Sequence, residues 1–435
     1  MNKLYGKMRF CFYRQERRDV KQVIVMGLGY IGLPTAVILA ANAYRVTGVD
    51  RDIKLLQELE QGKIHIEEPN LNLLFQQVRS EKKLRFSPQP ENADIFIIAV
   101  PTPARADKSC DMTNVLQAVE SILPQLQTGN LLIIESTIPP LSCEEIIKPL
   151  LEEAGHKVGE NLFLAFCPER VLPGDIVREL LVNNRVIGGF TRRCAQEAAK
   201  FYGSFLQGEI SLSDLKTAEM TKLLENTFRD VNIALVNEMT RICSHLGIDV
   251  LEVIRLANKH PRVKLLQPGP GVGGHCLAVD PYFIVEKAPS LTPLIKTARE
   301  VNASMPAFIV EKVQNLVAGM DKPHIAVFGL SYKGNIGDLR ESPAWEIVKA
   351  LRQEGYSIKV FDPHVRSVSG ENSAPAAVKD SDLILILTEH DEFRHLDYDE
   401  LAADMRTPLV FDTRNIIPAR ANPFSRIRLC HLGNT

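Results

Sequence analysis

The sequence lacks a strong charge of either sign and any long apolar run. Its 435 residues include 51 basic and 53 acidic side chains, which give a formal net charge of −2. A protein that binds nucleic acid or another polyanion is expected to be basic, so we expect no nucleic-acid partner. Every apolar run is shorter than the roughly 18 residues that a membrane helix needs, so we also expect no membrane association.

Cysteines and histidines are present, but not in patterns that bind metals or form disulfide frameworks. The eight cysteines are scattered without a CxxC pair, and the ten histidines show no metal-ligand spacing. We therefore expect no metal site and a location in the reducing cytoplasm. Residues 1–21 are basic but lack the apolar core of a secretory signal, and we expect a short N-terminal extension there.

The remaining composition is that of an ordinary globular protein. Apolar residues make up 45% of the chain and charged residues 24%. Because 435 residues exceed what one hydrophobic core usually holds, two or three domains are expected.

A dinucleotide-binding pattern follows the extension. In "QVIVMGLGYIGLPTAVILAAN" an apolar run is followed by Gly27, Gly29 and Gly32 in the order G-x-G-x-x-G and then by a helical segment. The next apolar strand ends at Asp50. The glycines would let the backbone approach a pyrophosphate at the helix N-terminus, and Asp50 would accept hydrogen bonds from the ribose, which favours NAD over NADP. The alternative is a tight turn without a ligand.

Several further apolar runs end in polar residues. "ADIFIIAVPTP" ends near Thr102, "LLIIEST" ends at Thr137, and "LFLAFCPER" ends at Glu169 and Arg170. Because ligands of open parallel sheets bind outside the carboxyl ends of the strands, we expect these side chains to line one crevice.

The pattern changes to helical from about Leu212 and returns to strands after Lys322. Apolar residues recur at intervals of three and four up to Gly247, which predicts one long helix. From "HIAVFGLSYKGN" onward the strand order of the first half recurs with a degraded glycine turn. We therefore expect an α/β fold of two doubly wound Rossmann-like domains joined by a long central helix. We place the NAD-binding domain at 22–211, a helical dimerisation domain at 212–318 and a second Rossmann-like domain at 319–435. Because its glycine turn is degraded, we expect this second domain to bind something other than a dinucleotide, or to be a purely structural copy.

The stretch "LLQPGPGVGGHCLAVDPYF" holds the strongest candidate for catalysis, Cys276. Most cysteines are inert and buried, but four glycines precede this one and Asp280 follows it, as in a backbone built around a ligand. A thiolate can add to an aldehyde, and hydride loss from the adduct gives a thioester that water cleaves. Cysteine and NAD together therefore favour an enzyme that makes acids.

Three other groups could bind an anion. Lys222 and Asn226 lie four residues apart on the long helix and could stabilise an oxyanion, or could be a solvated pair. "FGLSYKGNIGDLRESPA" contains Lys333 and further charges, and is either a ligand-binding loop or an ordinary helix cap. His260 and Arg262, beside the cysteine stretch, would suit a phosphate-bearing substrate.

The motifs resemble those of the UDP-sugar 6-dehydrogenases, also called the UDP-glucose/GDP-mannose dehydrogenase family. "GLGYIGLPTA", "VPTP", "EST", "CPERVLPG", "AEMTKLLENTFRDVN", "GPGVGGHCLAVDP" and "LSYKGNIGDLRESPA" occur in the order found in this family, over about residues 22–420. The resemblance implies oxidation of the primary alcohol of a nucleotide sugar to a carboxylate in two steps, with two NAD⁺.

The resemblance also implies roles for single residues. Cys276 is similar to the nucleophile, Lys222 and Asn226 to the pair that stabilises the oxyanion, and Asp280 to a carboxylate that transfers protons with Lys222 and a water. Thr137 and Glu169 match positions that organise water. The implied NAD site consists of Gly27, Gly29, Tyr30, Ile31, Gly32, Asp50, Arg51, Thr102 and Thr137. The implied substrate site consists of Glu169, Arg170, Val171, Lys222, Asn226, His260, Arg262, Gly273, Lys333 and Arg414.

Within the family, "CPERVLPG", "NNRVIGG" and "NKHPRVKLLQPGPGVGGHC" resemble the branch that oxidises N-acetylated sugars. The resemblance implies UDP-N-acetyl-D-mannosamine as substrate and a product used in bacterial surface polysaccharides. It also implies a homodimer or higher homo-oligomer in which His260 and Arg262 serve the neighbouring subunit's sugar site. UDP-N-acetylglucosamine is the alternative substrate. A catalytically silent nucleotide-sugar-binding regulator and a β-hydroxyacid dehydrogenase also stay open, although neither needs Cys276.

Overall fold

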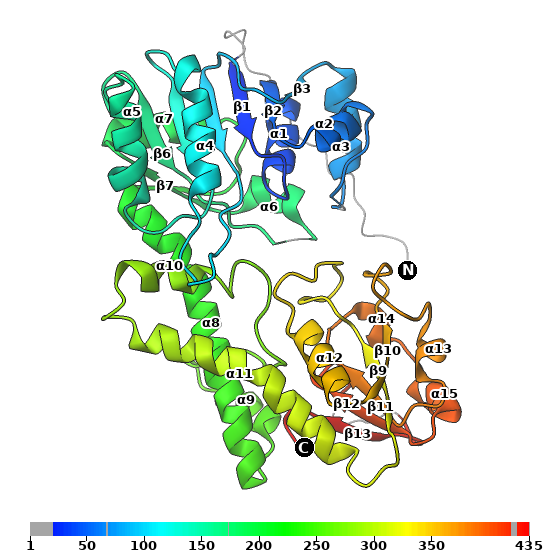
Figure 1. The fold of residues 1–435 in the computed structure, drawn as a ribbon. Helices are drawn as coiled ribbons and strands as arrows, with labels where there is room; N and C mark the ends of the chain where they lie inside the picture. The colour runs from blue at the N-terminus through cyan, green and yellow to red at the C-terminus, as the bar shows by residue number, and fades with distance from the viewer. Residues whose placement is uncertain (1–20, 67, 173, 419–423, 435) are drawn as a thin grey trace. The chain divides into compact units, whose positions relative to one another are not determined.

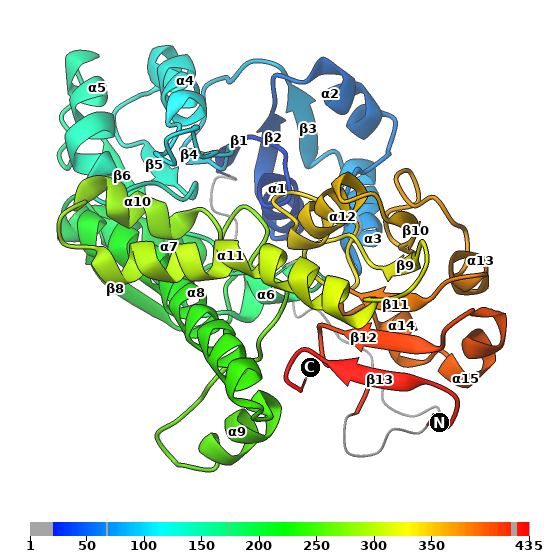
Figure 2. The same cartoon turned by 60° about the horizontal axis from the view of Figure 1, so that its bottom comes forward.

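The computed structural model describes residues 21–66, 68–172, 174–418 and 424–434, so nearly all of the expected N-terminal extension lies outside the described residues. The chain divides into two compact units, residues 1–222 and 223–435. Figures 1 and 2 trace the elements of each unit. In the described part of the chain no helix combines the length and apolar character needed to cross a bilayer.

The first unit is built on a sheet with the strand order β3-β2-β1-β4-β5-β6-β7-β8. Neighbouring strands are parallel except β6 and β7, which are antiparallel. The order reverses between β1 and β4, and the carboxyl ends of such strands are where open sheets bind ligands. The strands are β1 (Gln22–Met26), β2 (Arg45–Val49), β3 (Leu84–Ser87), β4 (Ile95–Ile98), β5 (Leu131–Ile134), β6 (Phe163–Phe166), β7 (Arg185–Gly189) and β8 (Ile210–Asp214).

Both faces of this sheet are buried, which explains why its strands read as continuous apolar runs. Val23 and Val25 of β1 join a buried cluster with α1, α3, α6 and α7, and Ile24 is equally buried on the opposite face. The helices are α1 (Gly32–Ala41), α2 (Ile53–Glu60), α3 (Leu71–Ser80), α4 (Thr113–Ile122), α5 (Lys148–Glu153), α6 (Ile176–Val182) and α7 (Arg192–Tyr202), with short helical turns η1 (Leu123–Gln125) and η2 (Cys143–Ile147).

Helix α8 (Leu215–Leu246) is the long helix that the periodicity predicts. It ends where Gly247 adopts a left-handed conformation with φ of +68°. The division between the two units falls within this helix, after Lys222. Three helices follow it: α9 (Val250–Ala257), α10 (Asp280–Lys287) and α11 (Pro293–Leu316).

The second unit contains a parallel sheet with the order β10-β9-β11-β12-β13, which Figure 2 shows strand by strand. The strands are β9 (His324–Phe328), β10 (Ser357–Phe361), β11 (Leu383–Ile386), β12 (Leu409–Asp412) and β13 (Arg428–His431). The remaining helices are α12 (Pro343–Gln353), α13 (Ala374–Val378), α14 (Asp391–Arg394) and α15 (Tyr398–Leu401), with the turn η3 (Ala402–Asp404).

Successive residues of β9 face opposite sides of the second sheet. Ile325 and Val327 pack in a cluster with α11 and α12, whereas Ala326 and Phe328 pack in a cluster with α13 and α15. The prediction of two doubly wound α/β domains joined by a long helix is therefore confirmed. The expected domain boundaries at 211/212 and 318/319 stay predictions.

Candidate functional site

The glycine turn after β1 has the geometry of a dinucleotide site. Gly27 has φ of +89°, and a Cβ there would lie 2.9 Å from the Ala99 carbonyl oxygen. A Cβ on Gly32 would lie 1.8 Å from the Gly27 oxygen, so this glycine allows α1 to pack against the turn. Gly29 is different, because a Cβ there would meet nothing within 4 Å. That open space at the start of α1 fits the pyrophosphate of NAD.

Asp50 follows β2 and accepts hydrogen bonds from two backbone N–H groups. Leu28 donates to Oδ2 at 2.9 Å and Asp52 donates to Oδ1 at 3.0 Å. The side chain is half-buried, so both oxygens keep lone pairs that a ribose can reach. Tyr30 and Arg51 are exposed beside this turn. These residues fit the NAD that the sequence pattern predicts.

Polar residues after β4 and β5 contact each other, and a polar residue after β6 contacts α8. Thr102 donates from Oγ1 to the Thr137 carbonyl at 2.6 Å. Lys222 donates from Nζ to the Glu169 carbonyl at 2.7 Å and lies 3.2 Å from the Glu169 carboxylate. The other Glu169 oxygen accepts from the Val171 N–H at 2.7 Å. The first unit thus joins Lys222 with Glu169, and Thr102 with Thr137.

Glu219 is a neighbour of this group whose contacts the sequence did not predict. It lies one turn before Lys222 on α8 and accepts hydrogen bonds from the N–H groups of Leu141 at 2.6 Å and Cys143 at 2.9 Å. Burial raises its pKa to about 7, against the effect of these hydrogen bonds. Its place on the predicted helix did not indicate which segment the carboxylate would contact. That segment follows Thr137.

In the second unit, Cys276 lies at the end of the glycine stretch and directly before α10. Among the cysteines that the structure describes, Cys276 is exposed and the others are buried. Gly274 donates its N–H to the Arg340 carbonyl at 3.1 Å. A Cβ on Gly273 would lie 2.5 Å from the Glu341 carbonyl and 2.7 Å from the Tyr332 Cβ. The glycines therefore let the cysteine segment pack against the segment that follows β9.

Asp280 and Asn226 are brought together in the same unit. The Asn226 amide donates to Asp280 Oδ2 at 2.5 Å, and both side chains are buried. The Asp280 N–H donates to the Cys276 carbonyl at 2.8 Å, which ties the start of α10 to the cysteine. Arg229 donates to the Asn226 amide oxygen. Three of the predicted catalytic residues, Cys276, Asp280 and Asn226, thus belong to one connected group.

Arg414 and Lys333 follow the ends of β12 and β9. Arg414 Nε lies 2.6 Å from the Glu389 carboxylate, and a Cβ on Gly269 would lie 2.6 Å from the Arg414 guanidinium. Burial would raise the pKa of Glu389, but the charge of Arg414 and the N–H of Gly334 hold it below its usual value. Glu389 is absent from the residues predicted from the sequence. Its place directly after an apolar strand was the available signal.

The other predicted substrate residues lie on exposed or half-buried segments. His260 and Arg262 are exposed after α9, where the Arg262 N–H donates to His260 Nδ1 at 3.4 Å. Arg170 donates to the Asn184 carbonyl at 3.3 Å. Ser342, by contrast, is buried directly before α12, and its hydroxyl donates to the Leu330 carbonyl at 2.5 Å rather than capping this helix.

Comparison with known proteins adds a family assignment to this geometry. The chain matches the three domain models of the UDP-glucose/GDP-mannose dehydrogenase family: the NAD binding domain at 21–206, the central domain at 216–304 and the UDP binding domain at 326–419.

Individual relatives and solved structures agree with the domain models. A UDP-N-acetyl-D-mannosamine dehydrogenase of Methanocaldococcus jannaschii is 46% identical over 91% of this chain and 93% of its own. An NDP-N-acetyl-D-galactosaminuronic acid dehydrogenase of Ralstonia solanacearum is 45% identical over 92% and 97%. The solved UDP-N-acetyl-mannosamine dehydrogenase of S. aureus has a TM-score of 0.90 and 48% identity, over 95% of this chain and 99% of that one.

Proposed function

This chain belongs to the UDP-glucose/GDP-mannose dehydrogenase family and is an NAD-dependent dehydrogenase, and we propose that it oxidises UDP-N-acetyl-D-mannosamine to UDP-N-acetyl-D-mannosaminuronate. The observation that carries the proposal is the connected group of Cys276, Asp280 and Asn226 in a chain that is 44% and 48% identical to two UDP-N-acetyl-D-mannosamine dehydrogenases. Such a group is suited to acyl chemistry on a sugar carbon.

We assign the NAD site to Gly27, Gly29, Tyr30, Ile31, Gly32, Asp50, Arg51, Thr102 and Thr137. NAD⁺ bound there supplies the hydride acceptor for each of two oxidations. Asp50 binds the ribose, and the open side of Gly29 admits the pyrophosphate. Thr102 and Thr137 form the adjacent edge, since their hydrogen bond joins the ends of β4 and β5.

Cys276 acts as the nucleophile after the first oxidation. Its thiolate adds to the aldehyde carbon, and the carbonyl electron pair moves to oxygen and gives a thiohemiacetal. The Lys222 ammonium and the Asn226 amide stabilise the resulting oxyanion as hydrogen-bond donors. Loss of a hydride from that carbon then leaves a thioester on Cys276. Asp280 manages the protons with Lys222 and a water molecule.

Water then cleaves the thioester to the carboxylate and restores the Cys276 thiol. Glu169 and Thr137 orient the water, and Glu169 is suited to this because its carboxylate is already fixed by Lys222 and the Val171 N–H. Lys333, at the junction of substrate and cofactor, and Arg414 bind the UDP-sugar, and Gly273, Arg170 and Val171 complete the substrate site. His260 and Arg262, exposed beyond α9, serve the sugar site of a neighbouring subunit.

The proposed assembly is a homodimer formed through α8. Four large apolar side chains of α8 are exposed: Leu224 (58%), Phe228 (62%), Leu235 (49%) and Ile242 (42%). Their spacing of four, seven and seven residues places them on one face of the helix, as in helices that pair with a copy of themselves. A continuous apolar stripe of this kind on an exposed helix is best explained by a partner that covers it.

We further propose a cytoplasmic location and a role in supplying a uronic acid for bacterial surface polysaccharides. None of the cysteines that the structure describes forms a disulfide, which suits a reducing compartment. We keep the division into an extension (1–21), an NAD-binding domain (22–211), a central helical domain (212–318) and a UDP-sugar-binding domain (319–435) as part of the proposal.

The decisive experiment is a panel of UDP-sugars with NAD⁺, monitored for NADH and for acid product. We expect the highest kcat/KM with UDP-N-acetyl-D-mannosamine and two NADH for each sugar consumed, because two hydrides leave the same carbon. Preference for UDP-N-acetylglucosamine or UDP-N-acetylgalactosamine would assign a different N-acetylated substrate. No NADH with any sugar, despite UDP binding, would favour a silent nucleotide-sugar-binding regulator.

A further inference from the structure

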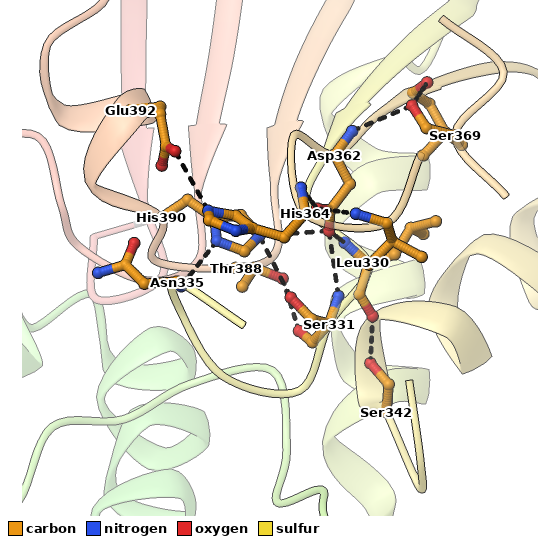
Figure 3. A network of polar contacts seen from close by, with 12 residues as sticks. Leu330, Ser331, Asn335, Ser342, Asp362, His364, Ser369, Thr388, His390 and Glu392 are labelled. Atoms are coloured by element: carbon orange, nitrogen blue, oxygen red, sulfur yellow. Dashed lines mark hydrogen bonds and ion pairs between the residues drawn. The ribbon is translucent and has the colours of Figure 1, made fainter. Parts of the chain in front are cut away.

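The segment that carries Lys333 is fixed on both sides by one buried side chain. Lys333 lies midway between Ser331 and Asn335, in the stretch that follows β9. His390, which lies after β11 and directly before α14, is fully buried and contacts both. Its Nδ1 accepts the Asn335 N–H at 2.8 Å, and its Nε2 lies 3.2 Å from the Ser331 hydroxyl. Figure 3 shows the imidazole between these two residues.

The hydrogen bonds define which nitrogen of His390 carries the proton. Because Nδ1 accepts an N–H, it is unprotonated, and the proton belongs to Nε2. Nε2 also lies 3.2 Å from Oδ2 of Asp362. An ionised carboxylate can only accept a hydrogen bond, whereas the Ser331 hydroxyl can donate or accept one. The imidazole therefore donates to Asp362 while it accepts from Asn335. Both ring nitrogens are used inside the protein.

Asp362 links the imidazole to the end of β9. Its Oδ2 accepts the N–H of Leu330 at 2.7 Å and that of Ser331 at 3.3 Å, and its Oδ1 accepts the N–H of His364 at 2.8 Å. Burial would raise its pKa, but His390 and these N–H groups hold the pKa below its usual value. Asp362 and His390 are therefore hydrogen-bonded to each other and to the residues on both sides of Lys333.

Asp362 has a counterpart in the first sheet, Asp50, and the two differ in burial and in their contacts. Asp50 follows β2 as Asp362 follows β10, and each accepts an N–H from the residue after a glycine with φ of +89°. Asp50 is half-buried, whereas Asp362 is 1% exposed and bonded to His390. In the second sheet, the carboxylate at the position that binds a ribose in dinucleotide sites is therefore Asp362, which is already hydrogen-bonded to His390.

A metal ion is a poor occupant of this cluster. His364, His390 and Glu392 place possible ligand atoms within 4.8 Å of one another. However, the lone pair on His390 Nδ1 accepts the Asn335 N–H, and Nε2 carries the proton directed at Asp362. His390 therefore has no free lone pair for a metal, and the cluster is better explained as a support.

We propose that His390 is a positioning residue for Lys333: it clamps Ser331 and Asn335 so that the lysine ammonium is held where it binds the UDP group. This inference rests on the proposed function only through the role of Lys333 in nucleotide binding. Asn335 has φ of +63°, a conformation that needs support when the residue is not glycine, and the Asn335 side chain is also tied to Asp391. Thr388 adds a hydrogen bond to the Ser331 carbonyl at 2.7 Å.

The test is a double-mutant cycle read by UDP binding, measured by calorimetry on the full chain. His390→Asn keeps an acceptor near Asn335, and His390→Gln keeps a donor toward Asp362, so neither bridges both sides. We expect each to weaken UDP binding by about tenfold, and Lys333→Met to weaken it by a similar or larger factor. In the Lys333→Met background, the His390 substitutions should cost no further affinity, because they act through the lysine.

Two controls separate positioning from general destabilisation. Tyr398→Phe removes another buried hydrogen bond of the same unit, from the Tyr398 hydroxyl to the Phe393 carbonyl, and should leave UDP affinity unchanged. NAD affinity should be unchanged in every variant. The proposal would be overturned if the His390 substitutions lowered UDP affinity equally in the wild-type and Lys333→Met backgrounds. It would also be overturned if neither His390 variant lost UDP affinity.

The cycle also separates this proposal from the proposed function. Wild-type protein that binds UDP but oxidises no UDP-N-acetyl sugar would contradict the substrate assignment alone. The double-mutant cycle could still be measured, because it depends only on UDP affinity. Wild-type protein that binds no UDP would overturn both.

Discussion

At the scale of single residues, Gly29 and Gly32 serve different purposes although they belong to one motif. A methyl group at Gly29 meets no atom of the protein, whereas at Gly32 it would overlap the Gly27 carbonyl. We expect Gly29→Ala to keep the melting temperature and raise the KM for NAD by about tenfold, equivalent to roughly 1.4 kcal/mol of binding. Gly32→Ala should instead lower stability by roughly 1–3 kcal/mol.

Thermal unfolding and initial rates at varied NAD concentration distinguish the two variants. The reverse result, a destabilised Gly29→Ala with normal KM, would contradict the assignment of this open space to the cofactor.

Cys276 is the residue on which acid formation depends in the proposed mechanism. Cys276→Ser should lower the rate of acid formation by more than about a thousandfold, because a serine hydroxyl is a far weaker nucleophile than a thiolate. NAD binding should survive, since the cofactor residues lie elsewhere in the chain. Cys243→Ser, at a buried cysteine of α8, is the matched control for loss of a thiol. Normal turnover of Cys276→Ser, followed by NADH release, would rule out the covalent route.

At the scale of elements, the cysteine segment depends on close contact with the segment after β9. A Cβ on Gly273 would lie 2.5 Å from the Glu341 carbonyl and 2.8 Å from Pro343 Cδ, and backbone cannot move away cheaply. We therefore expect Gly273→Ala to displace Cys276 and lower kcat/KM by roughly a hundredfold. Gly370→Ala, where a Cβ meets nothing within 4 Å, should have wild-type kinetics. Equal activity of the two variants would show that this contact does not position the cysteine.

Near its start, α8 is hydrogen-bonded to the segment after β5 through the carboxyl group of Glu219. Glu219 has its pKa raised from 4.5 to about 7 by burial. Between these pH values the folded protein keeps a proton that the unfolded chain has lost. The free energy of unfolding should therefore fall as the pH rises from about 4.5 to about 7, by up to about 3 kcal/mol, and then level off.

Urea unfolding of wild type and Glu219→Gln at several pH values tests this slope. Glutamine does not titrate, so Glu219→Gln should lack the pH-dependent stabilisation by Glu219. The difference in unfolding free energy between the two proteins should therefore change between about pH 4.5 and about pH 7. A constant difference from pH 4.5 to pH 8 would refute the assignment.

At the scale of the whole molecule, the fold was predictable because its signals are local and strong. The continuous apolar runs, the glycine turn before Asp50 and the stop at Gly247 each reflect sheet burial or backbone conformation. The contacts of Glu219 and His390 were not predictable, because they join residues that are 76 and 55 positions apart in the sequence. Only the packed structure shows which N–H groups such a buried polar side chain accepts.

The stripe on α8 leads to a prediction about assembly. Phe228 and Leu235 are 62% and 49% exposed on a face that continues through Leu224 and Ile242. In a two-fold dimer each substitution acts twice, so Phe228→Glu or Leu235→Lys should raise the dissociation constant of the dimer by at least about a hundredfold. Light scattering after size exclusion should then show monomers. Leu73→Lys, at a leucine 73% exposed on α3, should leave the dimer intact. A wild-type monomer, or dimers that withstand both charged substitutions, would contradict the assignment of this stripe to a second copy of the chain.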